Sequence, residues 1–125
     1  MPRLGSRSKS RLETCHPDLI KIMEEAINIL DFTVLCGERD EDAQTEAFDS
    51  GRSKVQFPNS KHNSSPSRAV DIAPYPVDWN DLQRFHHLAG IIKGIAHEKG
   101  IKIKWGGDFN SFFDGPHFQL PWSSD

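Results

Sequence analysis

Two short polar segments carry the residues of this sequence whose types and spacing fit metal chemistry. The first runs from Ser60 to Asp71 and contains His62, and the second runs from Asp114 to Leu120 and contains His117. Two histidines and one carboxylate are a frequent ligand set of open catalytic zinc sites, in which water takes the fourth position. His62, Asp71 and His117 are therefore candidate ligands of Zn²⁺.

A fourth residue, Asp114, is a candidate for proton transfer. A zinc site lowers the pKa of a bound water to about 7 and polarises a carbonyl. Peptide hydrolysis also needs a group that takes a proton from the water and delivers it to the leaving amine, and one carboxylate can do both in turn. On spacing alone the same residues also fit a site without metal. His62 would then be a loop histidine whose ring is hydrogen-bonded within the protein, Asp114 a turn aspartate and His117 a strand-end histidine.

The composition predicts one soluble globular domain over residues 1–125, because 36% of the 125 residues are hydrophobic and the 26% that are charged are of both signs. The net charge of −3 argues against a nucleic-acid partner. Neither a membrane-spanning stretch nor a secretory signal is visible, so we expect a monomer that is kept in the cytosol unless something else releases it. Cys15 and Cys36 lack a CxxC pattern and are expected to be free, buried thiols.

The first half of the chain predicts two helices around a buried strand. Residues 1–14 are polar and basic, and we expect an irregular, flexible arm. Apolar residues at helical spacing predict a helix over 17–30, and the strand-forming run 32–36 follows it. Asp40 is a suitable N-cap for a second helix that Gly51 ends, with Gln44 expected on its surface. Residues 52–68 form a long loop that contains His62.

The second half predicts a strand, the longest helix and two further strands. Residues 69–73 alternate as a strand in which Asp71 shares a face with two alanines and therefore needs a partner. A helix follows from about Asp78 or Asp81 to Gly100, then a strand over 101–105 and a last strand over 117–120. This order predicts an α+β domain with helices packed on a small antiparallel sheet.

The sequence resembles the M15 family of zinc peptidases, which includes D-alanyl-D-alanine carboxypeptidases and phage L-alanyl-D-glutamate endopeptidases. The resemblance lies in three dispersed motifs in the same order: Ser60-x-His62 with Ala69-x-Asp71, Trp105-Gly106-Gly107-Asp108-Phe109, and Asp114-x-x-His117-Phe118. Gly37-x-Arg39, Asp71-Ile72-Ala73-Pro74 and Asp78-Trp79 are most similar to the phage endopeptidase branch. One departure is the loop from Asn63 to Arg68, which is longer than in the family's short form and contains Pro66.

The resemblance implies a hedgehog/DD-peptidase-like single domain in which His62, Asp71 and His117 bind Zn²⁺ and Asp114 is the catalytic acid and base. It also implies that Arg39 and Ser60 line the substrate site, where the planar guanidinium of Arg39 can hold a carboxylate. The implied substrate is the stem peptide of bacterial peptidoglycan, cut at the L-alanyl-D-glutamate bond by a phage or prophage lysin. The alternatives are a D-alanyl-D-alanine carboxypeptidase with the same metal site and a non-catalytic module that binds the cell wall.

Overall fold

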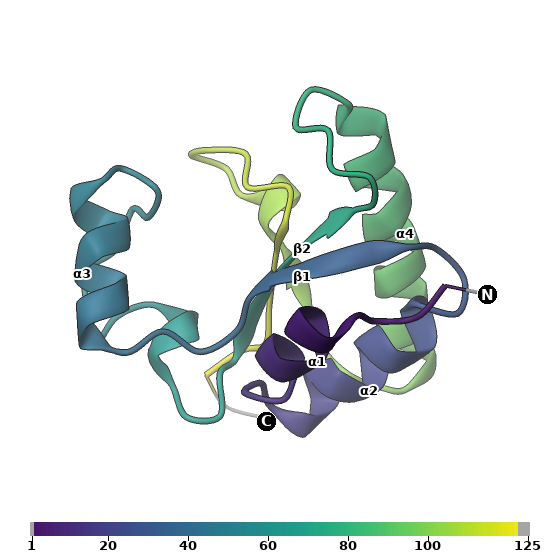
Figure 1. Ribbon diagram of the computed structural model, residues 1–125, viewed down its shortest axis with the longest axis horizontal. Coiled ribbons are helices and arrows are strands. Elements are labelled where there is room, and N and C mark those ends of the chain that lie inside the picture. The colour runs from purple at the N-terminus through teal and green to yellow at the C-terminus, as the bar shows by residue number, and fades with distance from the viewer. Residues whose placement is uncertain (1, 123–125) are drawn as a thin grey trace.

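The computed structural model describes residues 2–122, which form a four-stranded antiparallel sheet with helices packed against it (Figure 1). The strands are β1 (Phe32–Cys36), β2 (Ala69–Pro74), β3 (Lys104–Trp105) and β4 (His117–Gln119), in the order β1-β2-β4-β3. The helices are α1 (Ser6–Leu12), α2 (Pro17–Ala26), α3 (Glu41–Asp49) and α4 (Leu82–Glu98). This arrangement confirms the predicted α+β class.

A single apolar core joins the sheet to three of the helices. The apolar stripe of α2, with Leu19, Ile22 and Met23 fully buried, packs against α4, which buries Leu88 and Ile92. Stripes at this spacing are what a helix needs to cover a sheet. None of the helices in the described part of the chain has the length and apolar character needed to cross a bilayer.

The N-terminal segment differs from the irregular arm predicted from its polar sequence. Residues Ser6–Leu12 form helix α1, which lies along β1. Arg11 donates a hydrogen bond to the carbonyl oxygen of Val34 at 3.0 Å, and the hydroxyl of Ser8 accepts one from the Val34 N–H at 2.9 Å. Tertiary contacts therefore stabilise a helix whose own apolar content is low.

Two other predicted elements are shorter than expected. The helix predicted over 17–30 ends at Ala26, and residues 27–30 continue as turns. The strand predicted over 101–105 is limited to Lys104–Trp105, because it pairs only with β4. Lys104 lies opposite Gln119, so extending the ladder would place Lys102 opposite Pro121, which has no N–H to donate.

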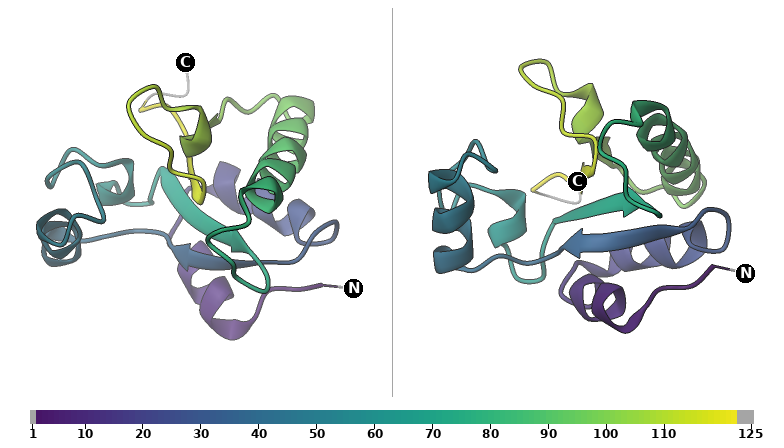
Figure 2. Two further views of the ribbon diagram at one scale, coloured as in Figure 1. Left: turned by 90° about the horizontal axis from the view of Figure 1, so that it is seen from above. Right: turned by 45° about the horizontal axis from the view of Figure 1, so that its top comes forward.

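Helix α3 stands apart from the other three helices, at the opposite end of the sheet (Figures 1 and 2). It begins as predicted, since the Asp40 carboxylate accepts a hydrogen bond from the Ala43 N–H at 2.9 Å. The 3-10 helix η1 (Lys61–Asn63) lies in the long loop that connects α3 to β2. This loop also places His62 next to the sheet, so it positions a candidate site residue.

Candidate metal centre and active site

The pairing of three strands places Asp71 between Cys36 and His117. Asp71 on β2 lies opposite His117 on β4 and, on its other side, opposite Cys36 on β1. A β-bulge in β1 between Val34 and Cys36 brings Cys36 into this register. Bulges are frequent beside active sites because they redirect side chains. The sheet thus assembles residues that are up to 81 positions apart in the sequence.

His62 enters the same cluster from η1. The Ser60 hydroxyl accepts a hydrogen bond from the His62 N–H at 3.1 Å, and the Ser60 N–H donates to the Asn63 side chain at 3.0 Å, which together form a capping box. His62 Nδ1 lies 2.7 Å from the carbonyl oxygen of Gly37, and His62 Nε2 lies 3.2 Å from Asp71 Oδ1. The imidazole ring is therefore held at both nitrogens.

His117 is held in a similar way from the other side. Its Nδ1 lies 3.1 Å from Asp71 Oδ1, and its Nε2 lies 2.7 Å from Gln119 Oε1. His117 and Gln119 are both on one face of β4, as the strand period predicts. The two imidazole rings meet edge to face, with their centroids 5.2 Å apart.

The hydrogen-bond pattern fits a bound cation. The outer nitrogen of each ring faces a carbonyl oxygen, of Gly37 or of Gln119, so in a neutral ring that nitrogen carries the proton. The inner nitrogens, which face Asp71, are Nε2 of His62 and Nδ1 of His117. They then direct lone pairs at one oxygen of the Asp71 carboxylate, so a proton or a metal ion must lie between nitrogen and oxygen. Partners on the outer nitrogen are also what orients metal-binding histidines. Tetrahedral Zn²⁺ holds neighbouring ligand atoms about 3.4 Å apart, close to the 3.1 and 3.2 Å found here.

Cys36 adds a further donor atom. Cys36, His62 and Asp71 each offer a ligand atom within 4.8 Å of the others, so this group can hold a metal ion. The Cys36 thiol, however, lies 4.0 Å from Nδ1 of His62, the nitrogen that already bonds to Gly37. No sequence motif indicates this role, because Cys36 is separated from His62 by 25 residues and belongs to no recognisable cysteine pattern. Cys15 and Cys36 are free thiols; Cys15 is buried as predicted, whereas Cys36 is only partly buried.

The charges in this cluster are strongly coupled. Burial by itself lowers the pKa of His62, but the hydrogen bonds to Asp71 and Cys36 and the negative charge of Asp71 together outweigh burial and raise that pKa to about 9. Burial likewise opposes ionisation of Asp71, but hydrogen bonds from His117 and His62 bring its pKa well below the ordinary value. Asp71 is therefore an anion that attracts cations to both histidines.

Asp114 lines the same cleft as the three candidate ligands. Burial, and then the negative charge of Asp71, raise its pKa. Gly106 holds the Asp114 turn against the end of β3, since the Asp114 N–H donates to the Gly106 carbonyl oxygen at 3.0 Å. A side chain at Gly106 would collide with the Asp114 backbone, and the Trp105 indole secures the same turn by donating to the Gly115 carbonyl oxygen at 2.7 Å.

Arg39 and Ser60, the two predicted substrate-binding residues, also line this cleft. Arg39 Nη2 donates to Asp71 Oδ2 at 3.2 Å, and Arg39 Nη1 donates to Gln44 Oε1 at 3.1 Å. The cleft has a volume of about 1120 Å³. Asp108, another residue of interest in the sequence, forms an ion pair with Lys93 at 2.7 Å and does not line the cleft.

Gln44 was expected on the surface of its helix, and this prediction was wrong. Gln44 is fully buried, and its amide nitrogen donates to the Ser53 hydroxyl and to the Val55 carbonyl oxygen, both at 2.8 Å. Its amide oxygen accepts from Arg39 and, at 3.2 Å, from Asn63. The sequence did contain a signal, because Gln44 precedes Ala47 and Phe48 by three and four positions and so lies on the apolar face of α3.

Comparisons with known proteins give the family of this chain. Residues 1–120 match the family model described as phage L-alanyl-D-glutamate peptidase. The chain belongs to this family. Its sequence is 30% identical over 135 aligned positions to that of the L-alanyl-D-glutamate peptidase of Escherichia phage T5. The alignment covers 94% of this chain and 97% of the phage protein.

A solved structure shares the fold. The crystal structure of the Serratia marcescens L-Ala D-Glu endopeptidase ChiX superposes on this chain with a TM-score of 0.82 and 31% sequence identity. The superposition covers 97% of this chain and 92% of the ChiX chain. The resemblance drawn from the sequence motifs is thereby confirmed at the level of family and fold, and the chain is a peptidase.

Proposed function

We propose that this protein is a zinc-dependent endopeptidase that hydrolyses the L-alanyl-D-glutamate bond in the stem peptide of bacterial peptidoglycan. The observation that carries the proposal is the convergence of His62 Nε2 and His117 Nδ1 on Asp71 Oδ1, at 3.2 and 3.1 Å. The names of the two relatives support the choice of bond. The proposed ligands are His62, Asp71 and His117.

Bound Zn²⁺ supplies Lewis-acid chemistry at this position, since it polarises a carbonyl oxygen and lowers the pKa of water. Gly37 and Gln119 fix the two imidazole rings through their outer nitrogens, which leaves the inner nitrogens available to the metal. Asp71 contributes the one negative charge of the ligand set, so the loaded site keeps a net positive charge.

Asp114 is the proposed general base and acid. Its carboxylate takes a proton from the attacking water as the new C–O bond forms at the alanine carbonyl carbon. The same group then delivers a proton to the nitrogen of D-glutamate as the C–N bond breaks. The raised pKa of Asp114 favours the second step, because a carboxyl group with a higher pKa is protonated more readily at neutral pH.

Arg39 and Ser60 are the proposed substrate-binding residues. Arg39 donates one hydrogen bond from each terminal nitrogen of its guanidinium group, to Asp71 and to Gln44, which orients a planar donor suited to the carboxylate of D-glutamate. The Ser60 oxygen accepts from the His62 backbone, so its own hydrogen is the part that can bond to a substrate carbonyl. We further infer that the enzyme acts on the cell wall as a monomeric lysin of phage or prophage origin.

The deciding experiment combines metal analysis with identification of the cleaved bond. Purified protein is expected to contain about one zinc per chain, and a chelator should abolish lysis of cell walls until zinc is restored. Mass spectrometry of digested muropeptides should detect new N-terminal D-glutamate. Release of terminal D-alanine alone would instead identify a D-alanyl-D-alanine carboxypeptidase.

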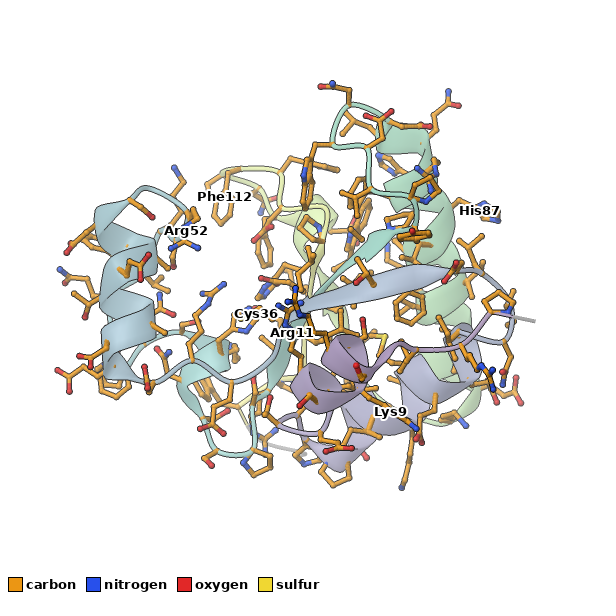
Figure 3. All side chains as sticks on the ribbon, viewed as in Figure 1. Lys9, Arg11, Cys36, Arg52, His87 and Phe112 are labelled. Carbon is orange, nitrogen blue, oxygen red and sulfur yellow. The ribbon has the colours of Figure 1, made fainter. Side chains whose placement is uncertain are left out.

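Two substitutions separate the proposed roles. His62→Ala should lose zinc and activity together, whereas Asp114→Asn should keep zinc and reduce kcat by at least about a hundredfold, because only proton transfer is removed. His87, an exposed histidine of α4 labelled in Figure 3, provides the matched control, and His87→Ala should keep both metal and activity. Near wild-type turnover by Asp114→Asn would refute the proton-transfer role.

A further inference from the structure

The cleft around the candidate site has two chemically different sides. Residues from the segments before α4 and before β4 form an aromatic wall, made of Trp79, Phe109, Phe112 and Phe113. Residues from the segments between β1 and β2 form a mainly basic wall, in which four cations outnumber the carboxylates of Glu38 and Glu46: Arg39, Arg52, Lys54 and Lys61. Figure 1 shows the segment of α3 on one side and the two loops that carry the aromatic wall on the other.

The aromatic wall exposes large apolar rings directly beside the candidate metal ligands. Phe109 lies 5.6 Å from His117 and 5.4 Å from Phe112, measured between ring centroids. Phe112, Phe113 and Trp79 are 37%, 46% and 55% exposed. A contiguous exposed apolar surface in a cleft is typical of a binding site.

Core residues hold two of these rings in place. The Trp79 ring stacks on Phe85 with centroids 5.7 Å apart, and the Phe113 ring meets the edge of Trp105 at 5.7 Å. Phe85 and Trp105 are both buried. The wall is therefore built on the core, and its open faces are directed to whatever enters the cleft.

The basic wall is suited to a different part of a ligand. Arg39 and Arg52 are paired with Asp71 and Glu46 at 3.2 Å each. Lys54 approaches the other wall, with its Nζ 5.9 Å from the centre of the Phe112 ring. Figure 3 shows Arg52 and Phe112 beside the same opening, on opposite walls. Acidic groups of a ligand fit the basic wall, and an uncharged apolar surface fits the aromatic wall.

The proposed substrate has this asymmetry. On the leaving side of the scissile bond is D-glutamate, which carries a carboxylate. On the other side, the nitrogen of L-alanine is acylated by the lactyl group of an N-acetylated amino sugar. The sugar ring lies about two residue lengths from the scissile carbonyl, or ~7 Å in an extended chain. One face of such a ring consists of C–H groups, which pack on aromatic rings.

We propose that the aromatic wall binds the amino sugar of the glycan strand, so that the preferred substrate is the glycan-linked stem peptide and not a free peptide. This inference rests on the proposed function. It also sets the direction of the substrate, with D-glutamate toward Arg39 and the sugar toward Phe112 and Phe113.

The test compares two soluble substrates that share the scissile bond and lack a charged N-terminus. One is an N-acetylated peptide that begins with L-Ala-D-Glu, and the other is the same peptide carried by N-acetylmuramic acid. For the zinc-loaded enzyme, kcat/KM measured by chromatography should be at least about tenfold higher for the sugar-bearing substrate. Phe112→Ala and Phe113→Ala should each reduce this ratio by about threefold or more.

Two further variants test whether the preference for the sugar-bearing substrate arises from the aromatic wall. Phe112→Trp retains an aromatic face and should keep the ratio. Tyr75→Ala removes a 60% exposed aromatic side chain that does not line the cleft, and it should leave the ratio unchanged. A wild-type ratio near one, or a ratio that neither Phe112→Ala nor Phe113→Ala lowers, would overturn the inference while leaving the proposed function intact. If neither substrate were cleaved, both the inference and the proposed function would be contradicted.

Discussion

At the scale of single residues, Gln44 connects the residues proposed to bind metal with those proposed to bind substrate. Its amide oxygen accepts from Arg39, which in turn donates to Asp71, and from Asn63, whose side chain completes the cap that positions His62. Its amide nitrogen fixes the Ser53–Val55 turn that leads into the basic wall. One buried amide thus orients Arg39, Asn63 and the Ser53–Val55 turn, all on the basic side of the cleft.

Replacing Gln44 with methionine should therefore reduce both stability and activity. The apolar side chain has a similar size but removes one hydrogen bond each from Arg39, Asn63 and the Val55 carbonyl oxygen. We expect a loss of about 1–3 kcal/mol in the free energy of unfolding and a loss of about 10–100-fold in kcat/KM. Chemical denaturation and steady-state kinetics would measure the two effects.

The control for this substitution is Gln83→Met, at an exposed position of α4. It should change neither quantity. A Gln44→Met enzyme with wild-type kcat/KM would show that Arg39 and Asn63 hold their positions without the amide.

At the scale of elements, the turn after β1 links α1 to the candidate metal centre. Gly37 packs so closely against the segment after α1 that a side chain would collide with Thr14 Oγ1 and the Arg11 carbonyl oxygen. The carbonyl oxygen of the same Gly37 faces Nδ1 of His62. The packing of α1 on β1 therefore influences the orientation of a proposed ligand.

We predict that Gly37→Ala lowers the free energy of unfolding by about 1–3 kcal/mol, since the methyl group overpacks this contact. It should also weaken zinc affinity, because displacement of the Gly37 carbonyl releases the His62 ring. Thermal denaturation and competition with a metal-binding dye would measure these effects. Gly94→Ala serves as the control, since a methyl group there meets open space. Unchanged zinc affinity in a destabilised Gly37→Ala protein would contradict the link.

How far the sequence predicts each element depends on where its stabilising contacts lie. Strand β1 was predicted at its observed bounds because its five consecutive residues are apolar or β-branched, and two of them, Phe32 and Val34, are buried in the sheet. Helix α1 was missed because Ser8 and Arg11 are stabilised by Val34, a contact invisible in local composition. The identities of the candidate ligands follow from residue types and motifs, but the bulge that places Cys36 beside Asp71 depends on strand register.

At the scale of the whole molecule, the charge cluster makes the stability of the metal-free protein depend on pH. The pKa of His62 is raised from 6.5 to about 9, so its stabilising effect is fully present below pH 6.5 and is lost as the pH rises through 9. The pKa of Asp71 is lowered from 3.8, so its contribution is present above that pH and is lost in acid. Stability should therefore be greatest between about pH 4 and pH 6.5.

We expect the free energy of unfolding of chelator-treated protein to fall by up to about 3 kcal/mol between pH 6.5 and pH 9.5. Urea denaturation at a series of pH values would measure this slope, and His62→Gln should remove most of it. Zinc binding should show the opposite trend, with affinity rising with pH, because the metal displaces the proton from His62. A flat profile for the metal-free protein would contradict the assigned charge of His62.

The direct pairing of Asp71 with His117 has a consequence for the order of events during synthesis. Strand β4 occupies an inner position of the sheet, between β2 and β3, yet it is the last of the described elements to be translated. The nascent chain thus exposes the edges of β2 and β3 until residues 117–119 leave the ribosome and insert between them. Because the same insertion delivers His117, a chain that lacks β4 also lacks one of the three proposed ligands, and the insertion of β4 is the step that assembles the candidate site.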